Sequence, residues 1–231
     1  MTLLNWEMTP DHVSILSDTL SVNGHDKRAR SFMTKIYPVP HLGGVITGTG
    51  VGRIVTSFYT TVIGDLIVDD VSQLAEFAPD ILRDLWSELC DDAPEGVTAT
   101  IYTFGLSDVG FVGFAFRSTN DFVAEPLQHG LAAKPAPDMA KLANINGLEE
   151  FVGLAHDQQD ADRALPRLDR VGIGGELWFY FLTRGESGGL SLRIDRIGRL
   201  AHFDDDRDII LAQLPANLGC AQSILALAKD P

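Results

Sequence analysis

The chain has 231 residues, 18 Lys and Arg, 32 Asp and Glu, and a formal net charge of −14. Hydrophobic residues make up 45% and charged residues 22%, which is typical of a globular protein. We predict a single domain over residues 1–231, and the negative charge excludes nucleic acid and anionic membranes as expected partners.

No apolar stretch approaches the roughly 20 residues of a membrane helix, and no secretory signal pattern is visible. We therefore expect a cytoplasmic protein with no membrane partner. The two cysteines, Cys90 and Cys220, are far apart and lack metal-ligand spacing. Two reduced, buried thiols are favoured over a disulfide.

The chain opens with segments whose apolar and polar residues alternate, which predicts β-strands. Turn residues lie at Pro10-Asp11 and at Asn23-Gly24. The predicted strands of this region are 2–8, 12–22, 34–39 and 43–48.

Apolar residues at helical spacing predict a helix over 51–63. A second helix is predicted to start near Asp69 and to run through Asp92, and Pro79 inside it predicts a kink or a break. A third helix is expected over 148–164. Asp204-Asp205-Asp206 indicates a loop, and 216–228 a last short helix.

The second half returns to strand patterns. Strands are predicted at 97–104, 110–117, 121–125, 171–183 and 189–196, the last two as a hairpin. Residues 126–147 contain three prolines and are expected to be an irregular connection. The run Leu177–Phe181 is apolar at alternate positions on both faces, so that strand is expected to be covered on both sides.

This order of elements is not a strict alternation of strand and helix, which disfavours a parallel doubly wound sheet. We predict an α+β fold, a four-layer αββα sandwich of two antiparallel sheets flanked by helices.

Three side chains carry the functional prediction: Thr2 next to Met1, Asp18 at the end of the second strand, and Lys35 at the start of a later one. Asp18 follows Thr2 by 16 positions and Lys35 by 33. If the strands pair as the turns indicate, all three lie at one end of a sheet. Gly48 ends the strand that leads into the first helix.

This pattern resembles the proteasome-type N-terminal nucleophile (Ntn) hydrolases, in particular proteasome β-subunits. The resemblance covers about the first 65 residues, with weaker support to about residue 185. It implies the αββα fold, with Thr2 as nucleophile, Lys35 and Asp18 tuning its pKa, and the Gly48 N–H as oxyanion donor. It also implies a peptide or amide substrate, no cofactor or metal, and self-association into a homo-oligomer.

The chemistry needs a free chain start, because the α-amine of the threonine takes the proton of its hydroxyl. An α-amine titrates near about 7.7–8.0, which suits a base at neutral pH. Methionine is usually removed before a residue as small as Thr, so we expect Met1 to be trimmed. A retained Met1 would leave the site without its base.

Two supporting segments depart from the family pattern. Ser-Gly-Gly is expected after the strands near residue 125, where this chain has Glu125–Gly130. A second loop, Asp-x-x-Ser-Gly-Gly, corresponds to Asp169–Gly175, which keeps Gly174-Gly175 but has Ile173 in place of Ser. Such segments hold a site in productive geometry, so these changes weaken the catalytic prediction more than the fold prediction.

Alternatives remain open. The chain is either a hydrolase or a non-catalytic relative kept for assembly or binding. An unrelated β-rich binding protein predicts that Thr2, Asp18 and Lys35 do not converge. The glycine-rich stretch 48–52 lacks the ending of a phosphate loop. His202, Asp204 and Asp206 are more typical of a solvated acidic loop than of a cation site.

Overall fold

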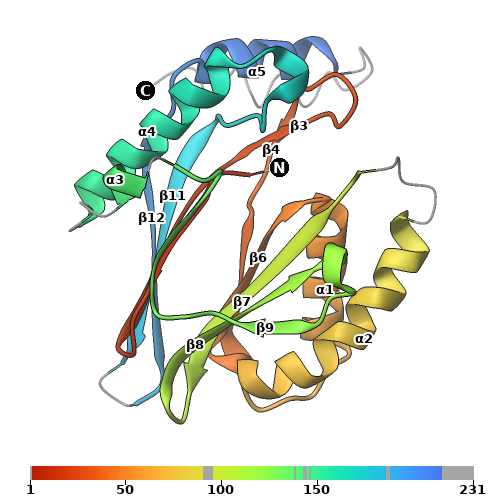
Figure 1. Cartoon of the computed structure of the whole chain (residues 1–231), viewed down its shortest axis with the longest axis vertical. Helices are drawn as coiled ribbons and strands as arrows, with labels where there is room; N and C mark the ends of the chain where they lie inside the picture. The colour runs from red at the N-terminus through yellow and green to blue at the C-terminus, as the bar shows by residue number, and fades with distance from the viewer. Residues whose placement is uncertain are drawn as a thin grey trace.

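In the computed structural model, two five-stranded antiparallel sheets pack face to face, with helices on both outer faces (Figure 1). The structure describes residues 2–90, 96–137, 139–142, 145, 147–185 and 188–214. The protein thus has the predicted α+β fold, an Ntn-hydrolase-like αββα sandwich. In the described residues, no helix is long and apolar enough to cross a membrane.

The first sheet has the strand order β10-β1-β2-β11-β12, and the second β5-β6-β7-β8-β9. The first consists of β1 (Leu4–Met8), β2 (His12–Asp18), β10 (Gly130–Lys134), β11 (Glu176–Arg184) and β12 (Leu190–Arg199). The second consists of β5 (Ile36–Val39), β6 (Gly44–Gly50), β7 (Ala99–Ser107), β8 (Gly110–Arg117) and β9 (Ala124–Pro126). A separate hairpin pairs β3 (Leu20–Val22) with β4 (Ala29–Phe32).

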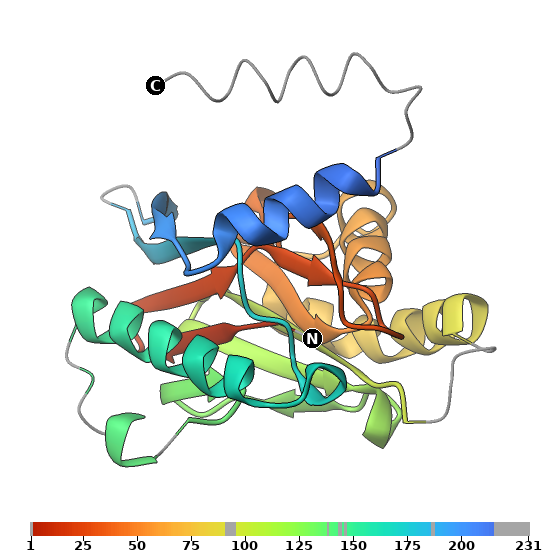
Figure 2. The same ribbon diagram turned by 90° about the horizontal axis from the view of Figure 1, so that it is seen from above.

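Three apolar clusters join the layers. α1 (Gly52–Gly64) and α2 (Val71–Cys90) cover the second sheet, and α4 (Leu148–Ala164) covers the first (Figures 1 and 2). Between the sheets, alternate residues of β1 point inward, and the Trp6 and Tyr102 rings lie 5.0 Å apart. This alternation is the period of a strand with two covered faces, and burial of such aromatic rings is a major part of a core's stability.

The strand Leu177–Phe181 is covered on both sides, as predicted. Leu177 and Phe179 belong to the cluster under α4, whereas Trp178 and Tyr180 face the other sheet. Leu177 and Tyr180 are buried, whereas Trp178, Phe179 and Phe181 are half-buried. Packing on both faces explains a continuous apolar run in an antiparallel strand.

The predicted strand 12–22 is divided at Thr19. β2 pairs with β1 and β11, and β3 leaves that sheet to pair with β4. The Thr19 hydroxyl accepts a hydrogen bond from the Glu176 N–H, and its carbonyl accepts one from the Met33 N–H. Thr19 therefore accepts hydrogen bonds both from the start of β11 and from the residue after β4. The β-ladder of β2 ends at this residue for that reason.

Two short strands were not predicted from the sequence. β4 lies within the basic stretch after Asn23-Gly24, and β10 within the connection 126–147 that was expected to be irregular. Each has five or fewer residues, and each is a strand because a neighbouring strand supplies its hydrogen bonds. In segments this short, the alternation of apolar and polar residues is too weak to predict a strand.

The helices also differ from expectation. α2 continues through Pro79, so the predicted break was wrong; its buried Leu74, Ala78 and Leu82 hold it against the second sheet. The loop predicted at Asp204–Asp206 is the first turn of α5 (Phe203–Ala212), where carboxylates meet the positive end of the helix. The helix predicted at 216–228 lies outside the described residues, as does Cys220; Cys90 is a buried free thiol.

Candidate active site

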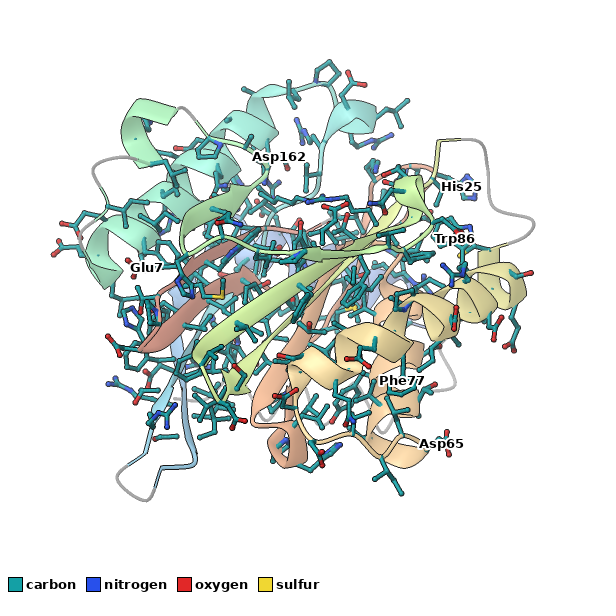
Figure 3. All side chains as sticks on the ribbon, turned by 60° about the horizontal axis from the view of Figure 1, so that its bottom comes forward. Glu7, His25, Asp65, Phe77, Trp86 and Asp162 are labelled. Atoms are coloured by element: carbon teal, nitrogen blue, oxygen red, sulfur yellow. The ribbon has the colours of Figure 1, made fainter. Side chains whose placement is uncertain are left out.

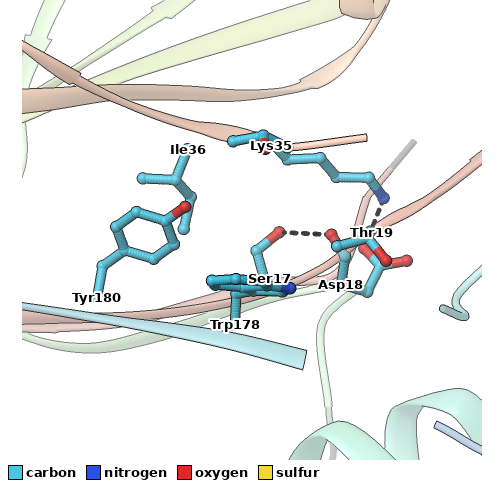
Figure 4. Close-up of a pocket in the computed structure, with 8 residues that line it drawn as sticks. Ser17, Asp18, Thr19, Lys35, Ile36, Trp178 and Tyr180 are labelled. Carbon is cyan, nitrogen blue, oxygen red and sulfur yellow. Dashed lines mark hydrogen bonds and ion pairs between the residues drawn. The ribbon is translucent and has the colours of Figure 1, made fainter. Parts of the chain in front are cut away.

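A buried ion pair joins the end of β2 to the start of β5. The Lys35 Nζ donates to Oδ1 of Asp18 over 2.6 Å (Figure 4). Asp18 is 1% exposed and Lys35 9%. The two residues are brought together because β2 and β5 lie in different sheets that face each other at this end of the sandwich.

Asp18 also binds the start of the chain and a distant loop. The Leu3 N–H donates to Asp18 Oδ1 over 3.1 Å, and the Gly174 N–H donates to Oδ2 over 3.0 Å. One carboxylate thus fixes the residue that follows Thr2, the lysine, and the loop before β11. Three donors on one buried carboxylate leave it little freedom to move.

The electrostatics of this pair reflect a balance between burial and attraction. Burial raises the pKa of the Asp18 carboxyl above its ordinary value, and Lys35 and the two backbone donors oppose the shift. Burial likewise lowers the pKa of the Lys35 ammonium, with Asp18 opposing. The proton between them is therefore held less strongly on nitrogen than in a solvated lysine.

Two hydroxyls position the backbone of the same region. Ser17 Oγ donates to the Leu3 carbonyl over 2.9 Å, and Thr47 Oγ1 donates to the Lys35 carbonyl over 2.8 Å. Both side chains are buried. Neither role was predicted from the sequence; the available signal was a hydroxyl directly before Asp18 and directly before Gly48 in mostly apolar strands.

Three of the four predicted site residues line one cleft of about 800 Å³. Thr2, Lys35 and Gly48 all line it, and Asp18 lies behind Lys35. Gly48 has no room for a side chain, because a Cβ there would lie 2.6 Å from Val55 Cγ2 and 2.8 Å from the Thr100 carbonyl oxygen. The Asp18–Lys35 pair and the Leu3 N–H on Asp18 place these two side chains together beside the start of the chain, which argues against an unrelated protein in which the three residues lie apart. Their catalytic roles stay a prediction.

The loop before β11 keeps its two glycines for clear reasons. A Cβ on Gly174 would lie 2.7 Å from Leu20 Cδ2, and Gly175 has a φ of +83° with Thr19 Oγ1 only 2.3 Å from a would-be Cβ. Ile173, where the family pattern has Ser, is fully buried in the cluster under α4. That position therefore supplies apolar packing and no hydroxyl.

Asp162 holds this loop from α4 (Figure 3). Its carboxylate accepts the N–H groups of Val171, Gly172 and Ile173 over 2.6, 3.0 and 3.1 Å. Asp162 is buried, so these three bonds replace hydration. The carboxylate thereby fixes the segment that presents the Gly174 N–H to Asp18.

We expect Asp162→Ala to lower the free energy of unfolding by about 2–3 kcal/mol, because buried N–H donors lose their acceptor. Any amide hydrolysis by the chain should become slower as well, because the loop would no longer hold Asp18 in place. Asp162→Asn keeps one acceptor oxygen and should lose less. Asp160→Ala, exposed on the same helix, should change stability by less than about 0.5 kcal/mol. Equal denaturation midpoints for Asp162→Ala and the unmodified chain would contradict this role.

Glu125–Gly130, where the other supporting segment was expected, begins in β9 at the edge of the second sheet. Glu125 and Asn120 bind each other at the edge of the second sheet, where Glu125 also pairs with Arg117. The strand that reaches the chain start is β10, whose Lys134 lies opposite Leu4. β10 runs antiparallel to β1, so the chain that follows Lys134 continues in the direction of Thr2.

A small polar cavity lies beside the ion pair (Figure 4). It has a volume of about 50 Å³ and is lined in part by Ser17, Lys35, Trp178 and Tyr180. The ranges that the structure describes contain no group of three or more side chains suited to hold a metal ion. His202 Nδ1 lies 3.0 Å from Asp205 Oδ2, and Asp206 pairs with Arg163.

Architecture and site geometry together define a proteasome-like Ntn-hydrolase fold. Among solved structures, the chain is similar to "Anbu (ancestral beta-subunit)" from Yersinia bercovieri, with a TM-score of 0.56 and 13% identity over 94% of this chain and 99% of that chain. It is also similar to an "Anbu (Gly-1) mutant" from Hyphomicrobium sp. strain MC1, with a TM-score of 0.59 and 11% identity over 100% of this chain and 98% of that chain.

These likenesses show the fold and correct the resemblance drawn from the sequence. Proteasome β-subunits were the wrong relatives to name, since the similar structures are Anbu proteins. No family model and no curated protein matches the sequence. Three ordinary residue types at a fixed spacing do not separate members of one fold from each other.

Proposed function

We propose that the chain is an Ntn-type amide hydrolase, a threonine peptidase or amidase, with Thr2 as its nucleophile once Met1 is removed. One observation carries the proposal: the Leu3 N–H and the Lys35 ammonium donate to the same oxygen of Asp18. The chain start and the lysine are thereby held together. Thr2 also lines a cleft large enough for a peptide segment.

In the proposed reaction the Thr2 hydroxyl attacks the substrate carbonyl while the Thr2 α-amine takes the hydroxyl proton. The oxyanion that forms is stabilised by the Gly48 N–H. Collapse of the tetrahedral intermediate breaks the C–N bond, the leaving amine receives the proton, and an ester on Thr2 remains. Water then attacks the ester, giving the carboxylic acid and restoring the hydroxyl.

Lys35 acts on this chemistry through its charge. While protonated, it disfavours a second positive charge nearby and lowers the pKa of the Thr2 amine, so that more of the amine is a free base at neutral pH. Asp18 keeps the ammonium in place. Its burial makes the effect strong, because few water molecules screen it.

Intact-mass measurement and active-site labelling test the proposal. Chains lacking Met1 should react with an electrophile that requires both the α-amine and the hydroxyl of an N-terminal threonine, and Thr2→Ala should not react. Equal labelling of Thr2→Ala, or complete retention of Met1, would contradict the mechanism.

A non-catalytic relative is the second candidate. Ile173 in place of the expected hydroxyl favours it, because that loop offers the site packing without a polar group. This candidate predicts a folded, assembled chain that neither labels nor hydrolyses amides.

Self-association belongs to the proposal under either candidate. The name of one similar structure, "ancestral beta-subunit", describes a subunit, which supports a homo-oligomer. Light scattering should give a particle mass that is a multiple of 25.1 kDa. A mass of one chain at micromolar concentration would contradict it.

A further inference from the structure

The cleft beside Thr2 is cationic although the chain as a whole is acidic. Lys27, Arg30, Lys35 and Arg53 line it, and its described lining residues include no Asp or Glu. Lys35 is paired with Asp18, and the other three cations are Lys27, Arg30 and Arg53. Within the described part of the chain, none of these three has an ion pair with a carboxylate. An acidic protein thus gathers unneutralised positive charge at one site.

The hairpin β3–β4 brings two of the cations to the cleft. Val22 pairs with Ala29 and Ser21 with Ser31, so Arg30 is the extra residue of a β-bulge. A bulge turns the extra side chain away from the regular alternation, and bulges are frequent beside active sites. Lys27 lies in the turn with a φ of +56°, and its N–H donates to the Asn23 carbonyl.

The opposite wall is the start of α1. Arg53 lies in its first turn, where a cation is electrostatically unfavourable. Its guanidinium donates to the Leu89 carbonyl near the end of α2, which offsets part of that cost. No side chain caps the N-terminus of α1, and Gly50, Val51 and Gly52 at that N-terminus line the cleft. The helix N–H groups therefore add to the positive potential of Arg53.

We propose that this cleft selects peptide or amide substrates that carry a carboxylate close to the scissile bond, as in a Glu or Asp side chain. The proposal rests on the hydrolase function proposed above. Apolar side chains of the cleft, among them Leu20, Val22 and Val55, would contact the methylene groups of the substrate. The three cations and the helix start would bind the carboxylate through charge-assisted hydrogen bonds. Arg30 and Arg53 are exposed, so this attraction should weaken as salt is added.

A nucleic acid is the disfavoured occupant. The net charge of −14 repels a long polyanion over the whole surface, whereas a single carboxylate interacts mainly with the cleft, within a Debye length of about 8–10 Å.

The test compares peptide amides with a fluorogenic leaving group that differ only in Glu or Gln before the scissile amide. The unmodified protein should hydrolyse the Glu peptide with a kcat/KM about tenfold higher, the scale of a difference of 1.4 kcal/mol. Arg30→Gln should reduce that ratio about three- to fivefold, near the upper range for a partly exposed charge pair. About 0.5 M salt should narrow it further.

Arg28→Gln is the matched control. Arg28 lies in the same hairpin, is exposed, pairs with Asp26 and does not line the cleft. It removes the same charge from the same segment, so the Glu-to-Gln ratio should stay unchanged. An equal drop in Arg28→Gln and Arg30→Gln would overturn the assignment to the cleft.

A binding measurement separates this inference from the hydrolase proposal. Thr2→Ala should bind the Glu peptide more tightly than the Gln peptide in fluorescence anisotropy, whether or not hydrolysis occurs. Tighter binding without hydrolysis by the unmodified protein would support the cleft and contradict the hydrolase. Equal hydrolysis and equal binding of both peptides would overturn the selectivity and leave the hydrolase intact. Displacement of the Glu peptide by a short RNA at lower concentration than by free Glu peptide would overturn the peptide assignment.

Discussion

Lys35→Met is expected to lower the free energy of unfolding at pH 7 by about 3–5 kcal/mol, the cost of leaving one partner of a buried ion pair unpaired. Met fills nearly the same space, so the loss reflects charge and not volume. Asp18 keeps its two backbone donors from Leu3 and Gly174, which is why complete unfolding is not expected. Denaturant titration measures the change.

The effect should depend on pH with a definite sign. Without Lys35, burial raises the pKa of Asp18 further above its unfolded value. A carboxyl of raised pKa favours the folded state fully at pH values below its unfolded pKa and loses that contribution as the pH rises through its folded pKa. The stability difference between Lys35→Met and the unmodified chain should therefore narrow as the pH falls from 7 towards 4. A difference that is constant over this range would show that Asp18 is not an unpaired carboxylate in the variant.

The double variant Asp18→Asn/Lys35→Met is the control for packing. It removes both charges while an amide oxygen remains for one of the backbone donors. Its loss of stability should be smaller than the sum of the two single losses, because the pair is coupled. The proposed hydrolysis should be abolished in both Lys35→Met and the double variant, although the two variants differ in their free energy of unfolding. The effect on activity can thereby be separated from the effect on stability.

The layers of the fold could be predicted from the sequence. Thr2 and Asp18 were expected to be close, because the turn at Pro10-Asp11 predicts the pairing of β1 with β2 that the structure has. The expectation that Lys35 lies at the end of the same sheet was wrong, because β5 belongs to the second sheet and the packing of the two sheets brings Lys35 to Asp18. Gly48 was expected to end the strand before the first helix, but β6 continues to Gly50. Its role as oxyanion donor stays a prediction.

The supporting residues could not be predicted, because their partners are distant in the chain. Gly174 donates to Asp18 across 156 positions. Asp162 binds 171–173 from a helix whose spacing shows only that its face is buried. β10 was missed because its five residues carry little pattern of their own and lie in a connection that contains several prolines.

The largest loss of activity is expected for Thr2→Ala. Removal of a covalent nucleophile lowers kcat by about three orders of magnitude or more in other hydrolases. Alanine is small enough for Met1 still to be removed. The variant therefore keeps the α-amine and lacks only the hydroxyl and the γ-methyl group of threonine. Thr2 is largely buried at the mouth of the cleft, and the Asp18–Lys35 pair does not depend on its side chain. Stability should therefore change little while hydrolysis is lost.

Thr2→Ser is the matched variant, because it restores the hydroxyl and also permits removal of Met1. It should hydrolyse the same fluorogenic peptide far faster than Thr2→Ala. In both the unmodified chain and Thr2→Ser, the rate should rise with pH as the α-amine loses its proton, since only the neutral amine can act as base. The labelled fraction should equal the fraction of chains that lack Met1. Suppose that Thr2→Ala and Thr2→Ser chains are both folded, have both lost Met1, and hydrolyse the peptide at equal rates. The hydroxyl of residue 2 then takes no part in the reaction.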